Sequence, residues 1–406
     1  MKQTCVLAAL AMGACVVQAG DWTQWRGSNR DLIVTETGLL KAWPEGGPKR
    51  LWQVDLPGDG YSSPVVVGGV LYITGNEGNM GYLYAMDAKT GAGDRWKLAY
   101  GQEWVANYPF ARTSPTVVGD LIYVTSGLGR LVCISIKDRK IVWEVNAHEV
   151  YGGRNITWGI AESPLVYDDK VITQPGGENA GVVALNAKTG ALVWRSAGLS
   201  ERSAYCSPAL ITLNGKRQLV TQLEDHAVGL DPETGAVLWK HPHRNRHAVH
   251  PNTPVLCGEN KVFISSGYGY GSEILEISGN TAKAVWTEKS SDNHFQGIAI
   301  YEGRIYSSGG GKMSCFDPKD GRRIYDVPDA RKTTFCITPS GMITYDEHGG
   351  KVLLVDIKSN PNTPKVVSSF AVNYGNDQHW SSPVVADGIL FLRRGKGVAA
   401  FDIAEK

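Results

Sequence analysis

Short apolar segments that alternate with turn residues repeat along most of the chain. In residues 182–194, an apolar run leads to Asn186, then to Thr189-Gly190, and a second apolar run ends at Trp194. An Asp or Asn side chain can bond its own backbone and start a turn, and Gly accepts the positive φ of a tight hairpin. Further copies span residues 227–239 and 83–96, and weaker ones end at Trp143, Trp286 and Tyr325.

A second hairpin precedes each of these copies, and a Ser-Pro or Thr-Pro pair commonly opens it, as at Ser63-Pro64 and Thr253-Pro254. Each unit is therefore a four-stranded meander, with a period of about 45 residues, which is typical of β-propeller blades. The pattern predicts an all-β, eight-bladed β-propeller of antiparallel meanders. Its blades begin near Tyr61, Arg112, Glu162, Tyr205, Asn252, Phe295, Thr334 and Trp380.

The last unit ends at residues 401–403 without a fourth strand or a Trp. Residues 51–56, which contain Trp52, have the pattern of an outer strand with no unit of their own. Pairing this N-terminal strand with the last blade would close the ring and remove an exposed sheet edge. We therefore expect one propeller domain over residues 20–406, with the Trp of each repeat, including Trp194 and Trp239, packed between blades rather than against a ligand.

Residues 1–19 have the features of an export signal. Lys2 precedes an apolar stretch from Val6 to Val17 that is too short to span a bilayer, and Ala19 marks a plausible cleavage point. A lipoprotein signal with Cys15 as the lipidated residue is the alternative, although Met12 stands where Leu is usual. No other stretch has the uninterrupted apolar length of a membrane helix, so we expect a periplasmic or secreted protein of the cell envelope.

Charge and cysteine content exclude several functions. Removing residues 1–19 takes Lys2 from the 41 basic residues and none of the 40 acidic ones, so the charges balance. A nucleic-acid binder needs a basic face, and none is indicated. The remaining cysteines lie far apart, without the spacing of a zinc or c-type haem site, and we expect small buried hydrophobic residues. They are Cys133, Cys206, Cys257, Cys315 and Cys336.

The Asp-x-x-Thr-Gly-x-x-x-Trp unit of residues 231–239 resembles the pyrroloquinoline-quinone (PQQ) repeat, and residues 21–31 look like the opening of exported bacterial propellers of this type. The resemblance covers nearly the whole mature chain. It implies one of two activities: quinoprotein dehydrogenases hold PQQ and calcium over the central channel, whereas BamB-type lipoproteins bind no quinone and act as scaffolds in outer-membrane protein assembly. The repeat indicates the fold and leaves the function open.

In a four-stranded meander, the loops between blades and those between the second and third strands fall on one face, here called the long-loop face. Its loops are long and carry aromatic and charged residues, whereas the opposite face has short turns. We expect it to bind an envelope protein, peptide or glycan without catalysis, cofactor or metal, in a monomer. The candidate binding residues are Arg112, Trp158, Glu162, Arg202, Tyr205, His250, Asn252, His294, Gln296, His379 and Trp380.

The alternative is a PQQ- and calcium-dependent dehydrogenase. Glu162 and Asn252 have the oxygen ligands that calcium prefers, Trp158 could form the floor, and arginines such as Arg112 and Arg202 could hold the quinone carboxylates. Against this, the adjacent-cysteine disulfide of the alcohol dehydrogenases is missing and no Asp stands beside these positions. Histidines on different blades could also converge on a metal, although their spacing does not indicate it; they are His226, His250, His294, His348 and His379.

Overall fold

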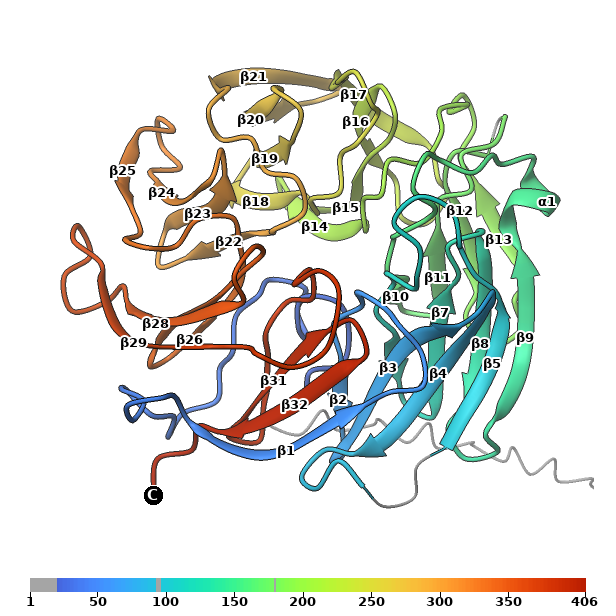
Figure 1. Ribbon diagram of the computed structural model, residues 1–406. Coiled ribbons are helices and arrows are strands. Elements are labelled where there is room, and N and C mark those ends of the chain that lie inside the picture. Colours follow the sequence, from blue (N-terminus) through green and yellow to red (C-terminus); the bar gives the residue numbers. More distant parts are fainter. Residues whose placement is uncertain (1–19, 93–95, 179) are drawn as a thin grey trace, which may run out of the picture.

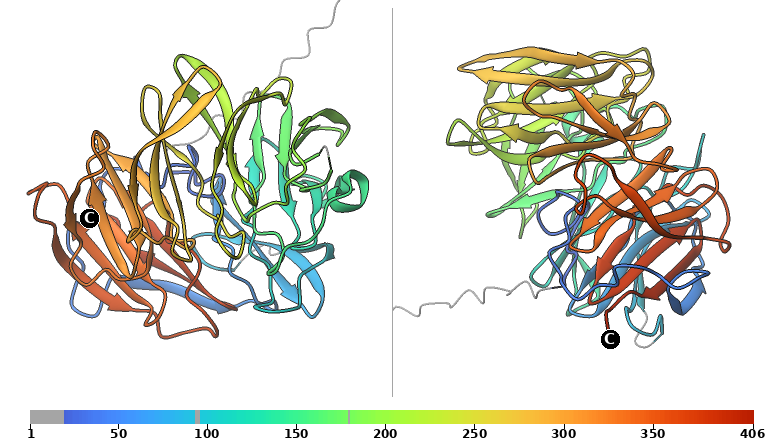
Figure 2. Two further views of the ribbon diagram at one scale, coloured as in Figure 1. Left: turned by 90° about the horizontal axis from the view of Figure 1, so that it is seen from above. Right: turned by 90° about the vertical axis from the view of Figure 1, so that its left-hand side faces the viewer.

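The structure is a computed structural model that describes residues 20–92, 96–178 and 180–406. The predicted export signal over residues 1–19, with the alternative lipid site at Cys15, lies outside the described residues. Eight four-stranded antiparallel sheets form a ring around a central axis (Figure 1), and two further views show the twisted blades from other sides (Figure 2). The predicted eight-bladed propeller is confirmed.

The strands of the first four blades follow the chain from the axis outward. Blade 1 contains β2 (Val65–Val67), β3 (Val70–Glu77), β4 (Met80–Asp87) and β5 (Trp96–Gln102). Blade 2 contains β6 (Thr116–Val118), β7 (Leu121–Thr125), β8 (Arg130–Ser135) and β9 (Lys140–Asn146). Blade 3 contains β10 (Leu165–Tyr167), β11 (Lys170–Thr173), β12 (Val183–Asn186) and β13 (Leu192–Arg195). Blade 4 contains β14 (Ala209–Leu213), β15 (Lys216–Gln222), β16 (His226–Leu230) and β17 (Val237–Pro242).

The other four blades continue in the same order. Blade 5 contains β18 (Val255–Gly258), β19 (Lys261–Ser266), β20 (Gly271–Ser278) and β21 (Thr281–Glu288). Blade 6 contains β22 (Ile298–Tyr301), β23 (Arg304–Gly309), β24 (Lys312–Phe316) and β25 (Arg323–Asp326). Blade 7 contains β26 (Thr333–Thr338), β27 (Gly341–Asp346), β28 (Lys351–Asp356) and β29 (Lys365–Ala371). Blade 8 contains β30 (Val384–Ala386), β31 (Ile389–Arg394), β32 (Gly397–Asp402) and β1 (Lys49–Asp55).

Blade 8 closes the ring as the sequence predicted. Strand β1 pairs antiparallel with β32, and Trp52 lies opposite Ala400. The buried Trp52 reaches the neighbouring blade, where its Nε1 donates a hydrogen bond of 2.9 Å to the Ala88 carbonyl. The N-terminal strand therefore joins the last blade to the first.

The hydrophobic core lies between the blades. Trp239 of blade 4 is buried together with Val220 of its own sheet and with Val262 and Ile264 of blade 5. Trp194 of blade 3 is buried in the same way against blade 4. Both tryptophans lie on outermost strands, away from the axis, so their predicted role in inter-blade packing fits their position.

The segment before β1 occupies the central channel, which the repeat pattern did not predict (Figure 1, blue). Trp22 exchanges backbone hydrogen bonds with Val66, and the Thr23 carbonyl accepts one from the Val117 amide. The chain then turns back along blade 7, where the Val34 amide donates to the Ile337 carbonyl. We call residues 20–40 the channel segment.

Two buried arginines hold the channel segment to the innermost strands. Arg30 donates hydrogen bonds of 2.9 Å to the carbonyls of Ser163 and Pro164, and Arg26 donates to those of Thr253 and Ile298. Burial lowers the pKa of Arg26 to about 10 and that of Arg30 to about 9, so both stay charged at neutral pH. Backbone carbonyls that face the channel therefore stabilise both charges.

The remaining features of the described chain are few. One α-helix is described, α1 (Ala147–Tyr151), and no helix in the described ranges has the length and apolar character needed to cross a bilayer. The five cysteines of residues 20–406 are free thiols. Cys133, Cys206, Cys315 and Cys336 are buried, and Cys257 is half-buried.

Candidate functional site

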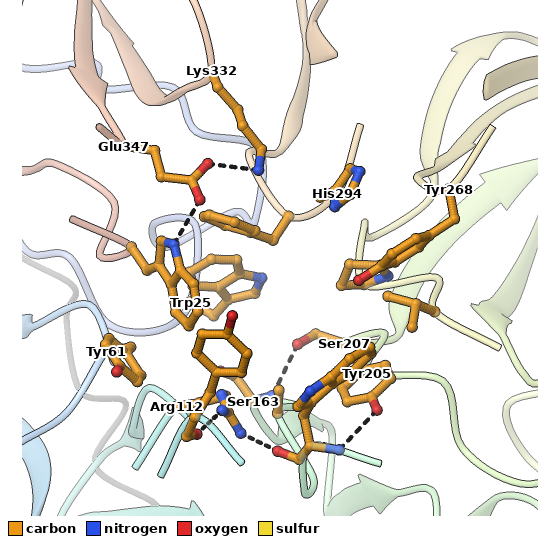
Figure 3. Close-up of a pocket in the computed structure, with 17 residues that line it drawn as sticks. Trp25, Tyr61, Arg112, Ser163, Tyr205, Ser207, Tyr268, His294, Lys332 and Glu347 are labelled. Carbon is orange, nitrogen blue, oxygen red and sulfur yellow. Dashed lines mark hydrogen bonds and ion pairs between the residues drawn. The ribbon is translucent and has the colours of Figure 1, made fainter. Parts of the chain in front are cut away.

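A cavity of about 390 Å³ opens on the long-loop face at the centre of the ring (Figure 3). Loops from several blades and the channel segment line it, and eight of its 17 lining residues are Trp, Tyr or Phe. We call it the aromatic cavity. Its lining residues are Trp25, Tyr61, Tyr108, Arg112, Trp158, Ala161, Ser163, Tyr205, Ser207, Val249, Pro251, Tyr268, His294, Phe295, Lys332, Glu347 and Trp380.

The rings form two groups. Trp158 lies nearly parallel to Tyr268, with an interplanar angle of 6° and ring centroids 6.3 Å apart, and it also contacts Tyr205. In the second group, Trp380 contacts Tyr61 at 4.7 Å, Tyr108 at 5.5 Å and Phe295 at 5.6 Å between ring centroids. The cavity is thus bounded by rings that also pack against each other.

Trp25 of the channel segment lies among these side chains (Figure 3). The indole is half-buried, and it reaches the cavity because the channel segment runs along the axis of the ring. Sequence reasoning missed Trp25, since the segment belongs to no blade. The one available signal was the aromatic, Arg-containing opening at residues 21–31, which has no place in a propeller repeat.

Arg112 contributes the positive charge in the cavity wall. Its two terminal nitrogens donate to the backbone carbonyls of Trp158 and Tyr108, which fixes the guanidinium. The guanidinium also lies 5.9 Å from the centre of the Tyr61 ring. Burial lowers the pKa of Arg112. No carboxylate of the described residues forms an ion pair with it.

The other charged groups of the cavity neutralise each other. Lys332 forms an ion pair of 2.8 Å with Glu347, whose other oxygen accepts a hydrogen bond of 2.9 Å from Trp380 Nε1. Lys332 also lies 5.8 Å from the centre of the Phe295 ring. Next to this pair, burial and the charge of Lys332 lower the pKa of His294. Lys332 and Glu347 were not among the candidates from the sequence, although Lys332 lies two residues before the start of blade 7 and Glu347 follows β27 on the same face.

A second, polar pocket of about 280 Å³ adjoins the aromatic cavity. Its lining residues are Thr157, Arg202, Glu224, Arg244, Asn245, Arg246, His247 and Ala248. His247 separates the two, because its ring lies 6.3 Å from that of Trp158 and 4.6 Å from that of Tyr268, both of which line the aromatic cavity. Two of the arginines are paired: Arg202 with Glu224, and Arg244 with Asp225 at 3.1 Å.

The structure distributes the candidate residues from the sequence over three environments. The aromatic cavity brings together Arg112, Trp158, Tyr205, His294 and Trp380, and Arg202 lines the polar pocket. The other five are buried behind these surfaces and line neither pocket, although the sequence analysis had placed all eleven candidates in one binding face. They are Glu162, His250, Asn252, Gln296 and His379.

The proposed calcium ligands are used by the fold. The Glu162 carboxylate accepts hydrogen bonds from the Thr173 hydroxyl, the Gln174 amide at 3.0 Å and the Gln174 side chain at 2.7 Å. The Asn252 side-chain oxygen accepts from the Gly297 amide at 3.2 Å. Both residues are buried, line neither pocket and have these oxygens engaged by the fold, so they do not present the expected pair of calcium ligands to the aromatic cavity.

The histidines do not converge on a metal site. His226 pairs with Glu201 at 2.8 Å, His294 with Asp292 at 3.5 Å, and His379 Nδ1 with the Tyr345 hydroxyl at 2.6 Å. In the part of the chain that the structure describes, no three His, Cys, Asp or Glu side chains come together as potential metal ligands.

His250 instead packs against His243. Their ring centroids are 4.4 Å apart, both rings are buried, and His250 Nε2 lies 3.2 Å from the Glu224 carbonyl. Burial lowers the pKa of His250 to about 4 and that of His243 well below its ordinary value. Both imidazoles are neutral at neutral pH.

Comparison with known proteins identifies the family. The family profile described as "Outer membrane protein assembly factor BamB" matches residues 79–327, which is more than half of the chain. The chain belongs to this family. The BamB protein of Burkholderia pseudomallei is 22% identical over 344 residues, which cover 74% of this chain and 82% of that protein.

Quinone-dependent dehydrogenases also match part of this chain. The quinoprotein ethanol dehydrogenase of Pseudomonas aeruginosa is 27% identical over 165 residues, which cover 37% of this chain. The matched segments span about a quarter of the length of this enzyme and of two quinone-dependent alcohol dehydrogenases. At these identities, both kinds of relative are distant.

Solved structures support the fold. BamB from Moraxella catarrhalis superposes with a TM-score of 0.59 at 14% identity and covers 87% of this chain and 97% of that one. A quinohemoprotein alcohol dehydrogenase from Comamonas testosteroni gives a TM-score of 0.67 at 13% identity and covers 97% of this chain and 82% of that one. Because a BamB protein and a dehydrogenase both share this architecture, the structural similarity supports the fold and does not distinguish their functions.

Proposed function

We propose that this protein is a monomeric cell-envelope propeller that binds a partner protein, peptide or glycan on its long-loop face, without catalysis and without a cofactor. The observation that carries the proposal is the aromatic cavity. Rings of Trp and Tyr supply large contact areas at low cost in conformational entropy, and with Arg they dominate many binding sites.

The polar groups of the cavity favour binding over chemistry. A general base needs a lone pair directed at the substrate, but the Glu347 carboxylate is engaged by Lys332 and Trp380. Arg112 is fixed by the carbonyls of Trp158 and Tyr108. A rigid set of aromatic and charged groups is preorganised for recognition.

The envelope setting rests on the export signal predicted for residues 1–19 and on the family. The relatives named outer membrane protein assembly factor act in that compartment by their description, and we extend the setting to this chain. The monomer is part of the proposal, and it agrees with a ring that β1 completes within one chain by adding the fourth strand to blade 8.

The competing proposal is a quinoprotein dehydrogenase, which the matched alcohol dehydrogenases favour. It is tested by adding PQQ and Ca²⁺ to the purified protein and recording the absorption spectrum after gel filtration. We expect no retained quinone. Stoichiometric retention, together with reduction of a dye by an alcohol, would replace the binding proposal with the enzymatic one.

The binding proposal is tested by capture from envelope extracts on the immobilised protein. We expect specific ligands to be retained by the wild type and lost with Trp158→Ala and Trp380→Ala. Val285→Ala, on the exposed outer strand β21, serves as the control, because its side chain is far from the channel. If all four proteins retain the same material, the aromatic cavity is not the binding site.

A further inference from the structure

We propose that the ligand of the long-loop face is an acidic glycan, a chain of sugar rings that carry carboxylates. One sugar ring would enter the aromatic cavity with its carboxylate on Arg112, and a neighbouring acidic unit would lie in the polar pocket by Arg246. This inference rests on the proposed binding function and specifies its ligand.

The size of the cavity favours a ring-shaped ligand. Its volume of about 390 Å³ lies in the range of small-molecule sites, which are concave and enclose most of the ligand. A stable protein partner instead buries about 800 Å² of a broad surface. The concave cavity with its aromatic walls therefore fits a single sugar unit, either terminal or internal in a glycan, better than it fits a flat protein surface.

The aromatic walls fit sugars. The face of an aromatic ring is the negative side of its quadrupole, and it attracts the weakly positive C–H groups that sugar rings present. Trp158 and Tyr268, nearly parallel to each other, offer such faces on one side of the cavity, and Trp380 lies on the other. Hydroxyl groups would remain at the mouth in contact with water.

The charges exclude a cationic ligand. An aromatic cavity can bind a cation over its rings, but here protein cations already occupy that role. Arg112 lies 5.9 Å from the Tyr61 ring centre and Lys332 lies 5.8 Å from that of Phe295. A cationic ligand would have to compete with both for these ring faces, and the charge of Arg112, which no ion pair offsets, would repel it.

Arg112 favours an anion. A guanidinium has five N–H donors, and the carbonyls of Trp158 and Tyr108 take one from each terminal nitrogen. Lys332 is neutralised by Glu347, whereas Arg112 has no ion-pair partner among the carboxylates that the structure describes. A carboxylate from the ligand would provide this partner in a charge-assisted hydrogen bond.

The polar pocket extends the same chemistry. Arg202 and Arg244 have carboxylate partners, but Arg246 forms no ion pair with any described residue. Thr157 lines the polar pocket and the adjacent Trp158 lines the aromatic cavity, so the two sites share a wall. The two neighbouring sites each contain an arginine without an ion-pair partner among the described residues, Arg112 and Arg246. This arrangement matches a polymer in which each repeating unit is a sugar ring that carries a carboxylate.

A peptide is the other class of ligand with suitable chemistry, and the geometry favours it less. Extended peptides are commonly held by main-chain hydrogen bonds to an exposed strand edge. Here Arg112 already uses the wall carbonyls of Trp158 and Tyr108, and the inner strands face the channel segment.

The test uses the full mature protein and a panel of monosaccharides and oligosaccharides of galacturonate, glucuronate, mannuronate or N-acetylmuramate, each paired with its methyl ester. Binding is measured by calorimetry and by the fluorescence of the cavity tryptophans. We expect at least one acidic oligosaccharide to bind at least tenfold more tightly than its ester. Trp158→Ala should weaken the binding of acid and ester alike.

The arginine variants locate the carboxylates. Arg112→Gln should abolish the preference for a monosaccharide acid over its ester, and Arg112→Lys, which keeps the charge, should retain part of it. Arg246→Gln, at an exposed side chain, should weaken the acidic trisaccharide and leave the monosaccharide unchanged. Arg217→Gln is the matched control, because Arg217 is paired with Asp168 at 2.7 Å and lines neither pocket.

The inference is overturned if no acidic oligosaccharide binds better than its ester, or if the preference survives in both Arg112→Gln and Arg246→Gln. Cavity-dependent capture of a protein or peptide, with no such preference in the panel, would refute the glycan and leave the proposed binding function standing. If the cavity variants affect neither glycan binding nor capture from extracts, both proposals fail.

Discussion

The indole of Trp194 lies directly over Gly235 of the next blade. A Cβ atom at Gly235 would come within 2.4 Å of Trp194 Cε3, and the Trp194 Nε1 donates a hydrogen bond of 3.0 Å to the Pro232 carbonyl in the same turn. The turn glycine of one repeat therefore packs against the Trp of the preceding repeat. Trp52 and Gly91, Trp143 and Gly190, and Trp286 and Gly321 form the same contact.

The first prediction tests this contact. Gly235→Ala should lower the free energy of unfolding by about 2–4 kcal/mol, because the new methyl group collides with Trp194 and the φ of 72° is unfavourable for Ala. The measurement is chemical denaturation. Gly215→Ala is the control, since Gly215 has a φ of 73° but a Cβ there would meet no atom within 4 Å.

The control should lose only the backbone term, about 1–2 kcal/mol. Equal losses in Gly235→Ala and Gly215→Ala would mean that the glycine of the repeat serves the turn alone and that the indole contact contributes nothing.

The second prediction concerns ring closure by β1. Trp52→Ala should cost about 3–5 kcal/mol, because it removes a large buried ring from the joint between blades 8 and 1. Leu51→Ala is the control on the same strand, since this side chain is 39% exposed and should change stability by less than about 0.5 kcal/mol. A Trp52 variant that melts like the Leu51 variant would show that the joint does not depend on this ring.

The sequence was sufficient to predict the blades, their number and the closure, because each of these depends on a local pattern that repeats. Trp194 and Trp239 could be assigned to inter-blade packing for the same reason. The cavity was harder to predict. Arg112, Trp158 and Trp380 lie at or just before blade starts and were found by position, whereas Trp25 belongs to no blade. Lys332 has a comparable position and was missed, because position alone does not show which of these side chains reach the cavity.

The candidates that line neither pocket also show that position along the chain does not determine where a side chain points. Glu162, Asn252 and Gln296 are polar residues at blade starts, like Arg112, but their side chains turn inward and bond to the backbone around the channel. Whether such a side chain faces the cavity depends on contacts between blades and with the channel segment. Those contacts are long-range and leave no mark in the local sequence.

The third prediction follows from the buried His243–His250 pair. The pKa of His250 is lowered to about 4 in the fold, whereas an unfolded His titrates near 6.5. Below about pH 6.5 the unfolded chain therefore binds a proton that the folded protein does not, so stability is complete above this pH and is lost as the pH falls toward 4. Between pH 7 and 5, His250 should account for a loss of about 2 kcal/mol.

The measurement is urea denaturation at both pH values for the wild type and for His250→Gln, which keeps a donor for the Glu224 carbonyl and does not titrate. The variant should lose less stability on acidification than the wild type does. An identical pH dependence of the two proteins would show that His250 is not held neutral by burial.

The last prediction separates a structural Glu162 from a metal-binding one. The carboxylate accepts hydrogen bonds from Thr173 and from the backbone and side chain of Gln174, and it faces the charge of Arg30 in the channel segment. Removing a buried acceptor leaves donors without partners, and hydrogen bonds to charged groups contribute about 1.5–3 kcal/mol each. Glu162→Gln puts an amide NH₂ where one oxygen accepts, so it should lower the free energy of unfolding by about 2–4 kcal/mol.

If Glu162 were a calcium ligand, the wild type should instead be stabilised by millimolar Ca²⁺ and the variant should not, because a ligand that binds the folded state raises its stability. We expect the stability of both proteins to be independent of Ca²⁺, with the difference between them unchanged. A Ca²⁺-dependent rise in the melting temperature of the wild type that Glu162→Gln abolishes would assign the carboxylate to a metal and revive the quinoprotein proposal.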